Sequence, residues 1–249
     1  MKYLLIILLF STLVLSQENK QKLTIGLGPY IQIQPYKDTE NIILPSPVIF
    51  YDNGLVYIRW SRAGIYFLGN KGDEFSWGLS LSIQPRVQSF DPSKSNELSN
   101  INEKKSTFEG GVAFSATFKD AYIESMLLTD ILDRYNDWIF KTELGYDLQL
   151  GNFGFYPSLI LVYQSDDFMN YYYGVSEEEA NNSSFGEYHP SAGFQIGAQT
   201  YIKYPITENL STLINLRVDK LPKTAKDSPI IETDLIYSGL LSLIYTFEY

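Results

Sequence analysis

The chain has 249 residues but no cysteine and a single histidine, His189, and it lacks long apolar runs beyond its N-terminus. Without cysteine, no disulfide can support the fold, so backbone pairing and packing must supply its stability. The shortage of cysteine and histidine also argues against a zinc site. Because no internal run approaches ~18 apolar residues, we expect no helical membrane span in that part of the chain.

Positive charge is scarce as well. The chain has 19 lysine and arginine residues against 29 aspartate and glutamate residues, which gives a formal net charge of −10. Proteins that bind nucleic acid neutralise its phosphates with lysine and arginine side chains. The charge balance therefore argues against a nucleic-acid partner.

The N-terminal segment has the pattern of a secretory signal peptide. Lys2 precedes a run from Tyr3 to Leu15 that is apolar apart from Ser11 and Thr12, which is too short for a membrane-spanning helix and fits the core of a signal peptide. We expect residues 1–16 to be removed after Ser16 and residues 17–249 to form one domain. An uncleaved anchor helix is the alternative. Gln17, rather than a cysteine, would follow the cut, so a lipoprotein is not expected.

Aromatic residues, in contrast, are plentiful, with 20 tyrosines and 15 phenylalanines. In residues 237–249 every second residue is apolar or aromatic, apart from Gly239, and the series ends on Tyr249. Period two is that of a strand with two different environments. A last strand that ends on an aromatic residue, in an exported chain, is typical of the closing strand of an outer-membrane β-barrel.

The same alternation recurs along the chain, most clearly in residues 75–88, 138–151 and 210–219. One face of each segment is apolar and essentially uncharged, while the other is rich in glycine, serine and glutamine. A soluble β-sandwich also alternates, but uncharged faces of this length favour contact with lipid. The segments have the length that a tilted membrane strand needs.

The number of strands depends on residues 43–69. Nine other strands are predicted, at 23–34, 75–88, 107–118, 120–129, 138–150, 153–164, 191–203, 208–219 and 236–249. Three more, at 44–51, 55–61 and 63–69, would make twelve, whereas one long strand at 55–69 would make ten. Asp52-Asn53-Gly54 is a tight-turn signal and favours twelve. The prediction is an all-β, antiparallel transmembrane β-barrel of about 12 strands, with 10 as the alternative.

The lengths of the links predict the orientation of the barrel. If the C-terminus lies in the periplasm, the short links near residues 118–120, 151–152 and 205–208 are periplasmic. The long polar links 91–106 and 165–188 are then extracellular, which is the asymmetry of outer-membrane barrels. We expect a monomer in the outer membrane of a Gram-negative bacterium, in contact with outer-membrane lipid and lipopolysaccharide.

Nine charged residues occupy the polar faces and are the predicted lining of the lumen. They could make the lumen selective, or they could pair across a narrow barrel and help to fill it. Barrels of about 8 strands are filled by side chains and those of 16 are open, so both interpretations stay open. The nine are Arg59, Arg86, Glu109, Glu124, Lys141, Glu143, Asp147, Arg217 and Asp219.

The sequence offers little for catalysis or metal binding. His189 could act as a general base with Ser191 or Glu187, but neighbours on a strand point to opposite faces, which favours an exposed histidine at a loop end. The acidic residues 166–167 and 177–179 could hold Ca²⁺ loosely, but the spacing of a dedicated calcium loop is missing, which favours a solvated loop. We assign no catalytic, cofactor or metal residues and expect no enzyme activity.

Several local motifs resemble those of one family of outer-membrane proteins, and they occur in consistent order. They are Leu44-Pro45 followed by Tyr51, Gly54 and Gly64-x-Tyr66; Tyr172-Tyr173-Gly174-Val175 with Ala180; Tyr188-x-Pro190-x-Ala192-Gly193; Asp227-Ser228-Pro229-Ile230-Ile231; and Tyr245-x-Phe247. In this order they resemble the MipA/OmpV family over nearly the whole mature chain. The chain extends past Phe247 by Glu248-Tyr249, where the family commonly stops at the phenylalanine.

This resemblance implies a function that the residues alone do not. The named member of the family is a scaffold that joins a lytic murein transglycosylase to a murein synthase, and other members are porin-like proteins or adhesins. The resemblance therefore implies a non-enzymatic scaffold with murein enzymes as partners. A narrow porin-like channel and a surface adhesin are the alternatives. The short periplasmic links leave little visible surface for such partners.

Overall fold

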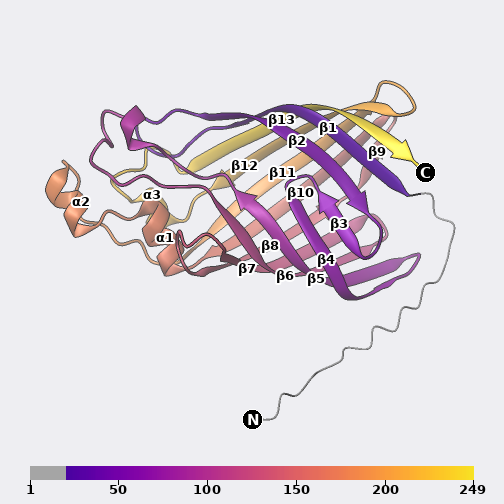
Figure 1. Ribbon diagram of the computed structural model, residues 1–249, viewed down its shortest axis with the longest axis horizontal. Coiled ribbons are helices and arrows are strands. Elements are labelled where there is room, and N and C mark those ends of the chain that lie inside the picture. The colour runs from indigo at the N-terminus through magenta and orange to yellow at the C-terminus, as the bar shows by residue number, and fades with distance from the viewer. Residues whose placement is uncertain (1–20) are drawn as a thin grey trace, which may run out of the picture.

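The computed structural model describes residues 21–249, and the predicted signal peptide, residues 1–16, lies outside this part of the chain. Among the described residues, no helix combines the length and apolar character needed to cross a membrane. The elements in chain order (Figure 1) are β1 (Lys22–Gln32), β2 (Ile42–Asp52), β3 (Val56–Arg59), β4 (Arg62–Lys71), β5 (Phe75–Arg86), the 3₁₀ helix η1 (Pro92–Lys94), β6 (Thr107–Phe118), β7 (Ala121–Asp130), β8 (Trp138–Tyr146), β9 (Leu148–Leu150), β10 (Phe153–Gln164), α1 (Asp166–Tyr173), α2 (Glu177–Asn182), β11 (Gly193–Pro205), β12 (Leu210–Lys220), α3 (Lys223–Lys226) and β13 (Leu235–Glu248).

The strands form one closed antiparallel barrel. Each strand pairs with its sequence neighbours, except that β8 and β9 do not pair with each other, and β13 pairs with β1, with Lys22 opposite Glu248 and Gln32 opposite Ser238. Both β8 and β9 pair with β10, so they occupy a single place in the wall. The prediction of 12 strands is confirmed, and the alternative of 10 is wrong.

The alternation seen in the sequence separates the two surfaces of the barrel. Leu27, Leu159 and Leu243 point outward and are more than half exposed, whereas Ser82 and Glu109 point inward and are buried. The exposed apolar surface fits a lipid environment. Aromatic contacts mark both rims of this surface: Trp138 and Tyr163 stack near the loop ends of their strands, and Tyr245 contacts Phe247 near the C-terminus.

The two ends of the barrel differ, as predicted from the link lengths. We call the end that holds the C-terminus and the short links the turn end, and the opposite end, with α1, α2 and α3, the loop end (Figure 1). Most turn-end links span a few residues, such as 119–120 and 151–152. At the β2–β3 link, the Asp52 and Asn53 side chains accept backbone N–H groups, and Gly54 has a φ of 82°.

One strand departs from the prediction. The sequence predicts a strand over residues 55–61, but β3 is four residues long and ends at Arg59. A two-residue turn, Trp60-Ser61, then brings the chain back into β4, where Arg62 pairs with Arg59. Trp60 adopts a φ of 55°, which permits this tight reversal. The β3–β4 hairpin therefore ends part-way up the wall, beside two much longer strands (Figure 1).

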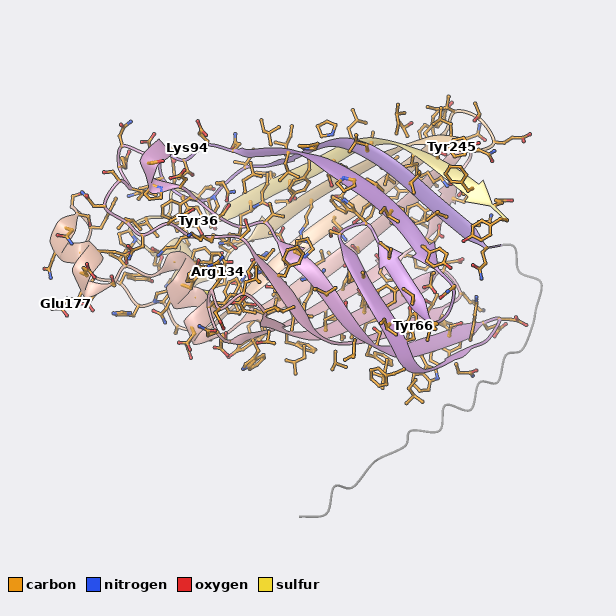
Figure 2. All side chains as sticks on the ribbon, viewed as in Figure 1. Tyr36, Tyr66, Lys94, Arg134, Glu177 and Tyr245 are labelled. Carbon is orange, nitrogen blue, oxygen red and sulfur yellow. The ribbon has the colours of Figure 1, made fainter. Side chains whose placement is uncertain are left out.

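The long loops pack together over the loop end of the barrel. Their buried side chains continue the apolar cluster formed by Met126, Ile139 and Val162 inside the barrel. We call the loop side chains of this cluster the loop core: Tyr36, Phe90, Leu98, Ile101, Tyr135, Phe168, Met169, Tyr172, Tyr173, Val175, Leu221, Ala225, Ile230 and Ile231. Figure 2 shows Tyr36 among these loops, and Glu177 at their outer tip.

Candidate functional site

The interior of the barrel holds a cavity of about 2520 Å³. Its lining begins at the turn end, with Gln21, Asn53 and Lys119, and continues along the barrel as far as Gln88. Within residues 21–249, no side chain of the loop core belongs to this lining. The cavity therefore reaches the turn-end rim and stops beneath the loop core.

All nine charged residues predicted for the lumen line this cavity. Eight of them form four ion pairs. Arg59 lies 3.2 Å from Glu124, Lys141 lies 3.6 Å from Glu143, Arg217 lies 2.6 Å from Asp219, and Arg86 contacts Glu109. The ninth residue, Asp147, lies in the break between β8 and β9, and its backbone N–H bonds to the Asp120 carbonyl. Whether these residues select a solute stays a prediction.

One of these pairs ties the short hairpin to another part of the wall. Glu124 lies on β7, four strands along the sheet from β3. Its two carboxylate oxygens contact Arg59 at 3.2 Å and Arg62 at 2.5 Å. Arg62 was not among the predicted lumen residues, and it shares the inner face because it lies opposite Arg59 across the hairpin turn. The tip of the hairpin is thus held from inside by one buried carboxylate.

The lumen also has an aromatic side, which the sequence reasoning did not identify. The Trp60 ring lies 6.0 Å from Tyr30 and 6.1 Å from Tyr201, and its indole N–H donates to the Ser46 hydroxyl at 3.0 Å. These rings pack against a small cluster that includes Leu240 on β13. The alternation could have placed Tyr30 and Tyr201 inside, but the inward position of Trp60 depends on the hairpin turn.

The carboxylates of the lumen are well supplied with hydrogen-bond donors. Glu143 accepts from Tyr122 at 2.9 Å, Ser158 at 3.0 Å and Gln199 at 2.8 Å. Glu109 likewise accepts from Gln84 at 2.8 Å, in addition to its contact with Arg86. Buried charges persist where such partners compensate the loss of water, so these carboxylates hold the inner wall in a defined arrangement.

Tyrosine side chains connect the loop core to the barrel. The Gln88 amide donates to the hydroxyls of Tyr36 and Tyr173, each at 3.0 Å. The Tyr135 hydroxyl donates to Glu109 at 3.0 Å. Burial raises the pKa of Tyr173 to about 12, so this hydroxyl stays protonated at neutral pH. The loop core is therefore joined to the inner wall by hydrogen bonds as well as by apolar contact.

The acidic run 177–179 was predicted to be solvated, and for Glu179 this is wrong. Glu179 is buried, accepts the backbone N–H groups of Ser176 and Asn102 at 2.8 Å each, and lies 3.5 Å from Lys104. Burial opposes its charge, but these contacts outweigh it and lower its pKa. Burial also lowers the pKa of Lys104, against the opposing effect of Glu179. The capping box at α2 explains this role, because Glu179 occupies its third helical position.

His189 lies on the outer surface of the loop end, with nearly two thirds of its side chain exposed. Its Nε2 lies 2.8 Å from Glu187 and its Nδ1 lies 3.2 Å from Asn170. Among the described residues, Ser191 makes no hydrogen bond to this ring. Elsewhere in residues 21–249, no group of three or more acidic or histidine side chains could hold a metal ion.

Comparison with known proteins gives a consistent result. Residues 25–247 match the family model described as MltA-interacting protein MipA. An Escherichia coli K12 outer membrane protein named YiaT is 25% identical over 244 residues, which covers 97% of this chain and 98% of that protein. The MltA-interacting protein of the same organism is 24% identical over 228 residues, which covers 92% of this chain and 90% of that protein.

Among solved structures, the match to the NanC porin covers 90% of this chain and 98% of the porin chain, with 10% identity and a TM-score of 0.40. The names of the relatives and the lipid-compatible barrel together support the predicted location, and this chain is an outer-membrane protein. The turn end is accordingly periplasmic and the loop end extracellular.

Proposed function

Because the chain belongs to the MltA-interacting protein MipA family, we propose that it is a non-enzymatic scaffold that binds a murein enzyme at its periplasmic mouth. The relative is named for its interaction with MltA. By resemblance, the proposed partners are a lytic murein transglycosylase and a murein synthase. The observation that carries this proposal is the cavity, which reaches the periplasmic rim and stops beneath the loop core.

The cavity removes the difficulty that the short periplasmic links create. Links such as 119–120 offer little surface by themselves, but a wide concave mouth can accept a projecting segment of a partner. The rim carries Lys22, Lys71, Lys119 and Asp120, which can form charge-assisted hydrogen bonds with such a segment. We further propose that the barrel is a monomer embedded in lipid, with lipopolysaccharide around its extracellular half.

Site-specific photocrosslinking tests this proposal. A photoreactive amino acid at Asn53, in the β2–β3 turn on the rim, should crosslink to a purified lytic murein transglycosylase from the same organism. The matched control places the same amino acid at Lys223, on α3 at the loop end. Crosslinking at Asn53 but not at Lys223 supports the proposal. Absence of any crosslink at the rim, with both variants folded, contradicts it.

A narrow channel is the second candidate, and the charged lining of the lumen favours it. A water-soluble solute could reach the extracellular solution only if the loop core moved aside, since that core covers the extracellular end of the cavity. Recordings of the purified protein in planar bilayers separate the two functions. We expect no stepwise current from the wild-type protein, and regular current steps would favour the channel.

A further inference from the structure

The barrel wall has a window in its extracellular half. Trp60 pairs with Ile49 on β2, and Ala63 pairs with Ile83 on β5. Beyond these points, β2 and β5 have no strand between them, because the β3–β4 hairpin has ended. At the level of the hairpin, β3 and β4 separate β2 from β5, so the two strands lie three strand spacings apart, about 14 Å. The gap between β2 and β5 starts where the hairpin ends.

Contacts between two loops close the window at its outer edge. The Asp38 carboxylate, in the β1–β2 loop, accepts the backbone N–H of Asn96 at 2.7 Å. Asn96 lies in the β5–β6 loop, and the same pair of loops is joined by Lys94 and Glu40 at 3.3 Å. These hydrogen bonds hold the pKa of Asp38 below its usual value. The gap is therefore bounded by the hairpin tip, two strands and a loop bridge.

Proline occupies the edges of this window where an N–H group would otherwise face it. The Trp60 N–H bonds to the Ile49 carbonyl at 2.7 Å, so Ile49 directs its backbone groups away from β1. Backbone groups alternate along an antiparallel strand, so Pro47 and Pro45 direct theirs the same way, into the gap. An unpaired N–H facing lipid is costly, and proline has none.

The opposite edge follows the same rule. The Ile131 N–H bonds to the Phe108 carbonyl at 2.9 Å, so Phe108 directs its backbone groups toward β7. Pro85 is opposite Phe108 in the register, and it must therefore direct its own backbone groups away from β6 and into the gap. Three prolines thus fit the two unpaired edges, as expected of strand edges that stay open.

The cavity reaches this frame from inside. Its lining includes Leu44, Ser46 and Pro47 on one edge, and Pro85 with Val87 on the other. The aromatic side of the lumen, Tyr30, Trp60 and Tyr201, lies directly within, since Trp60 forms the tip of the hairpin. An alkyl chain that passed the window would therefore meet these rings first.

Deeper in the lumen, the groups with unused hydrogen-bond donors are the cationic side chains. Among the described residues, the Lys141 ammonium has one ion-pair partner, Glu143 at 3.6 Å, and no other hydrogen bond. The Arg86 guanidinium uses only its Nε in the pair with Glu109. The carboxylates, in contrast, accept up to three or four donors each. This imbalance favours a ligand that accepts hydrogen bonds and carries negative charge.

We propose that the barrel binds an anionic amphiphile with a single alkyl chain, which enters from the outer leaflet through the window between β2 and β5. The head group lies near Lys141 in the lumen, and the chain lies against Trp60 and Tyr201 and extends through the window. This binding uses the extracellular half of the cavity and does not depend on a partner at the periplasmic mouth.

Tryptophan fluorescence of the folded protein in neutral detergent tests the proposal. Brominated lauric acid quenches the fluorescence of a nearby indole. The quenching of Trp60 is obtained as the difference between the quenching of the wild-type protein and that of Trp60→Phe. We expect saturable quenching of Trp60 and about ten-fold weaker binding of the neutral brominated alcohol, because a charged hydrogen bond is lost. Lys141→Gln should weaken laurate binding by a similar factor, about ten-fold. Lys71→Gln, on the periplasmic rim, should leave it unchanged.

The absence of cysteine allows the route to be tested on protein that is already folded. A bulky maleimide attached at Pro47→Cys should block binding, whereas the same label at Leu159→Cys, on the lipid-facing surface of β10, should not. No saturable quenching, or equal binding of acid and alcohol, overturns the proposed ligand. Unchanged binding after labelling at Pro47→Cys overturns the window as its route.

Discussion

The two ends of this barrel are built on opposite principles. The extracellular end is closed by a core of buried side chains from five loops, among them Tyr36, Phe90, Tyr135, Tyr172 and Ile231. The periplasmic end has short turns, and the cavity reaches its rim. A long loop can fold back and bury apolar surface, whereas a tight turn cannot. The length of the links therefore decides which end of the lumen is accessible.

The largest effect should come from removing the centre of the loop core. Replacing residues 166–188 with a short glycine-serine linker removes α1, whose Phe168, Met169 and Tyr173 are fully buried over the lumen. Because apolar packing closes this end, we expect the variant to show stepwise currents in planar bilayers that the wild-type protein lacks. A folded variant without current, with folding checked by heat-modifiable electrophoretic mobility, would mean that other residues close the lumen.

A smaller effect should come from releasing the β3–β4 hairpin between the two ends. Glu124→Gln leaves Arg59 and Arg62 without their shared carboxylate, which should lower the free energy of unfolding by about 2–3 kcal/mol. Asp147→Asn is the matched control. Asp147 also lines the cavity but forms no ion pair among the described residues, so it should change stability by less than about 0.5 kcal/mol. Equal effects in urea unfolding would contradict this role of Glu124.

Acid should loosen the loop end before the barrel wall. The folded-state pKa values of Glu179 and Asp38 are both lowered. Such groups add stability above their unfolded pKa of about 4 and lose it as pH falls through the lower folded value. Amide hydrogen exchange, corrected for intrinsic rates, should show lost protection near residues 96–104 and 176–180 at low pH. If the amides of the barrel strands lost their protection at the same pH, the loop core would not be a separate unit of stability.

The smallest effect is expected for the single histidine. His189→Ala removes two hydrogen bonds of an exposed side chain, so the free energy of unfolding should change by less than about 0.5 kcal/mol. The urea midpoint measures this change. A much larger loss would show that Glu187, His189 and Asn170 support the loop end more than their exposure indicates.

The barrel itself could be predicted because one local rule governs it. Alternation of apolar and polar residues fixes the inward face of each strand, so Glu109, Lys141 and Arg217 could be placed in the lumen from the sequence. The loop core could not be predicted, because it depends on contacts between residues as distant as Tyr36 and Ile231. In the sequence around the buried residues Tyr172 and Tyr173, no periodic pattern distinguishes a buried tyrosine from an exposed one.

The sequence also contains a signal for the window, which the alternation of apolar and polar residues does not reveal. Pro45, Pro47 and Pro85 fall inside predicted strands, and proline in a strand indicates an unpaired edge. Together with the short span between Gly54 and Arg62, they could have suggested a gap beside β3. The inward position of Trp60 could not be predicted, since it follows from the φ of 55° at a turn within the wall.

The central claim is that the lumen opens to the periplasm and is closed to the extracellular solution, and labelling of a single cysteine tests it most directly. Ser115→Cys places a thiol in the cavity, and Ser184→Cys places one on the exposed loop end. The reagent is a maleimide too large for the general porins of the outer membrane. On intact cells, it should label only Ser184→Cys, and after the outer membrane is permeabilised it should label both. Labelling of Ser115→Cys on intact cells at the rate of Ser184→Cys would contradict the account.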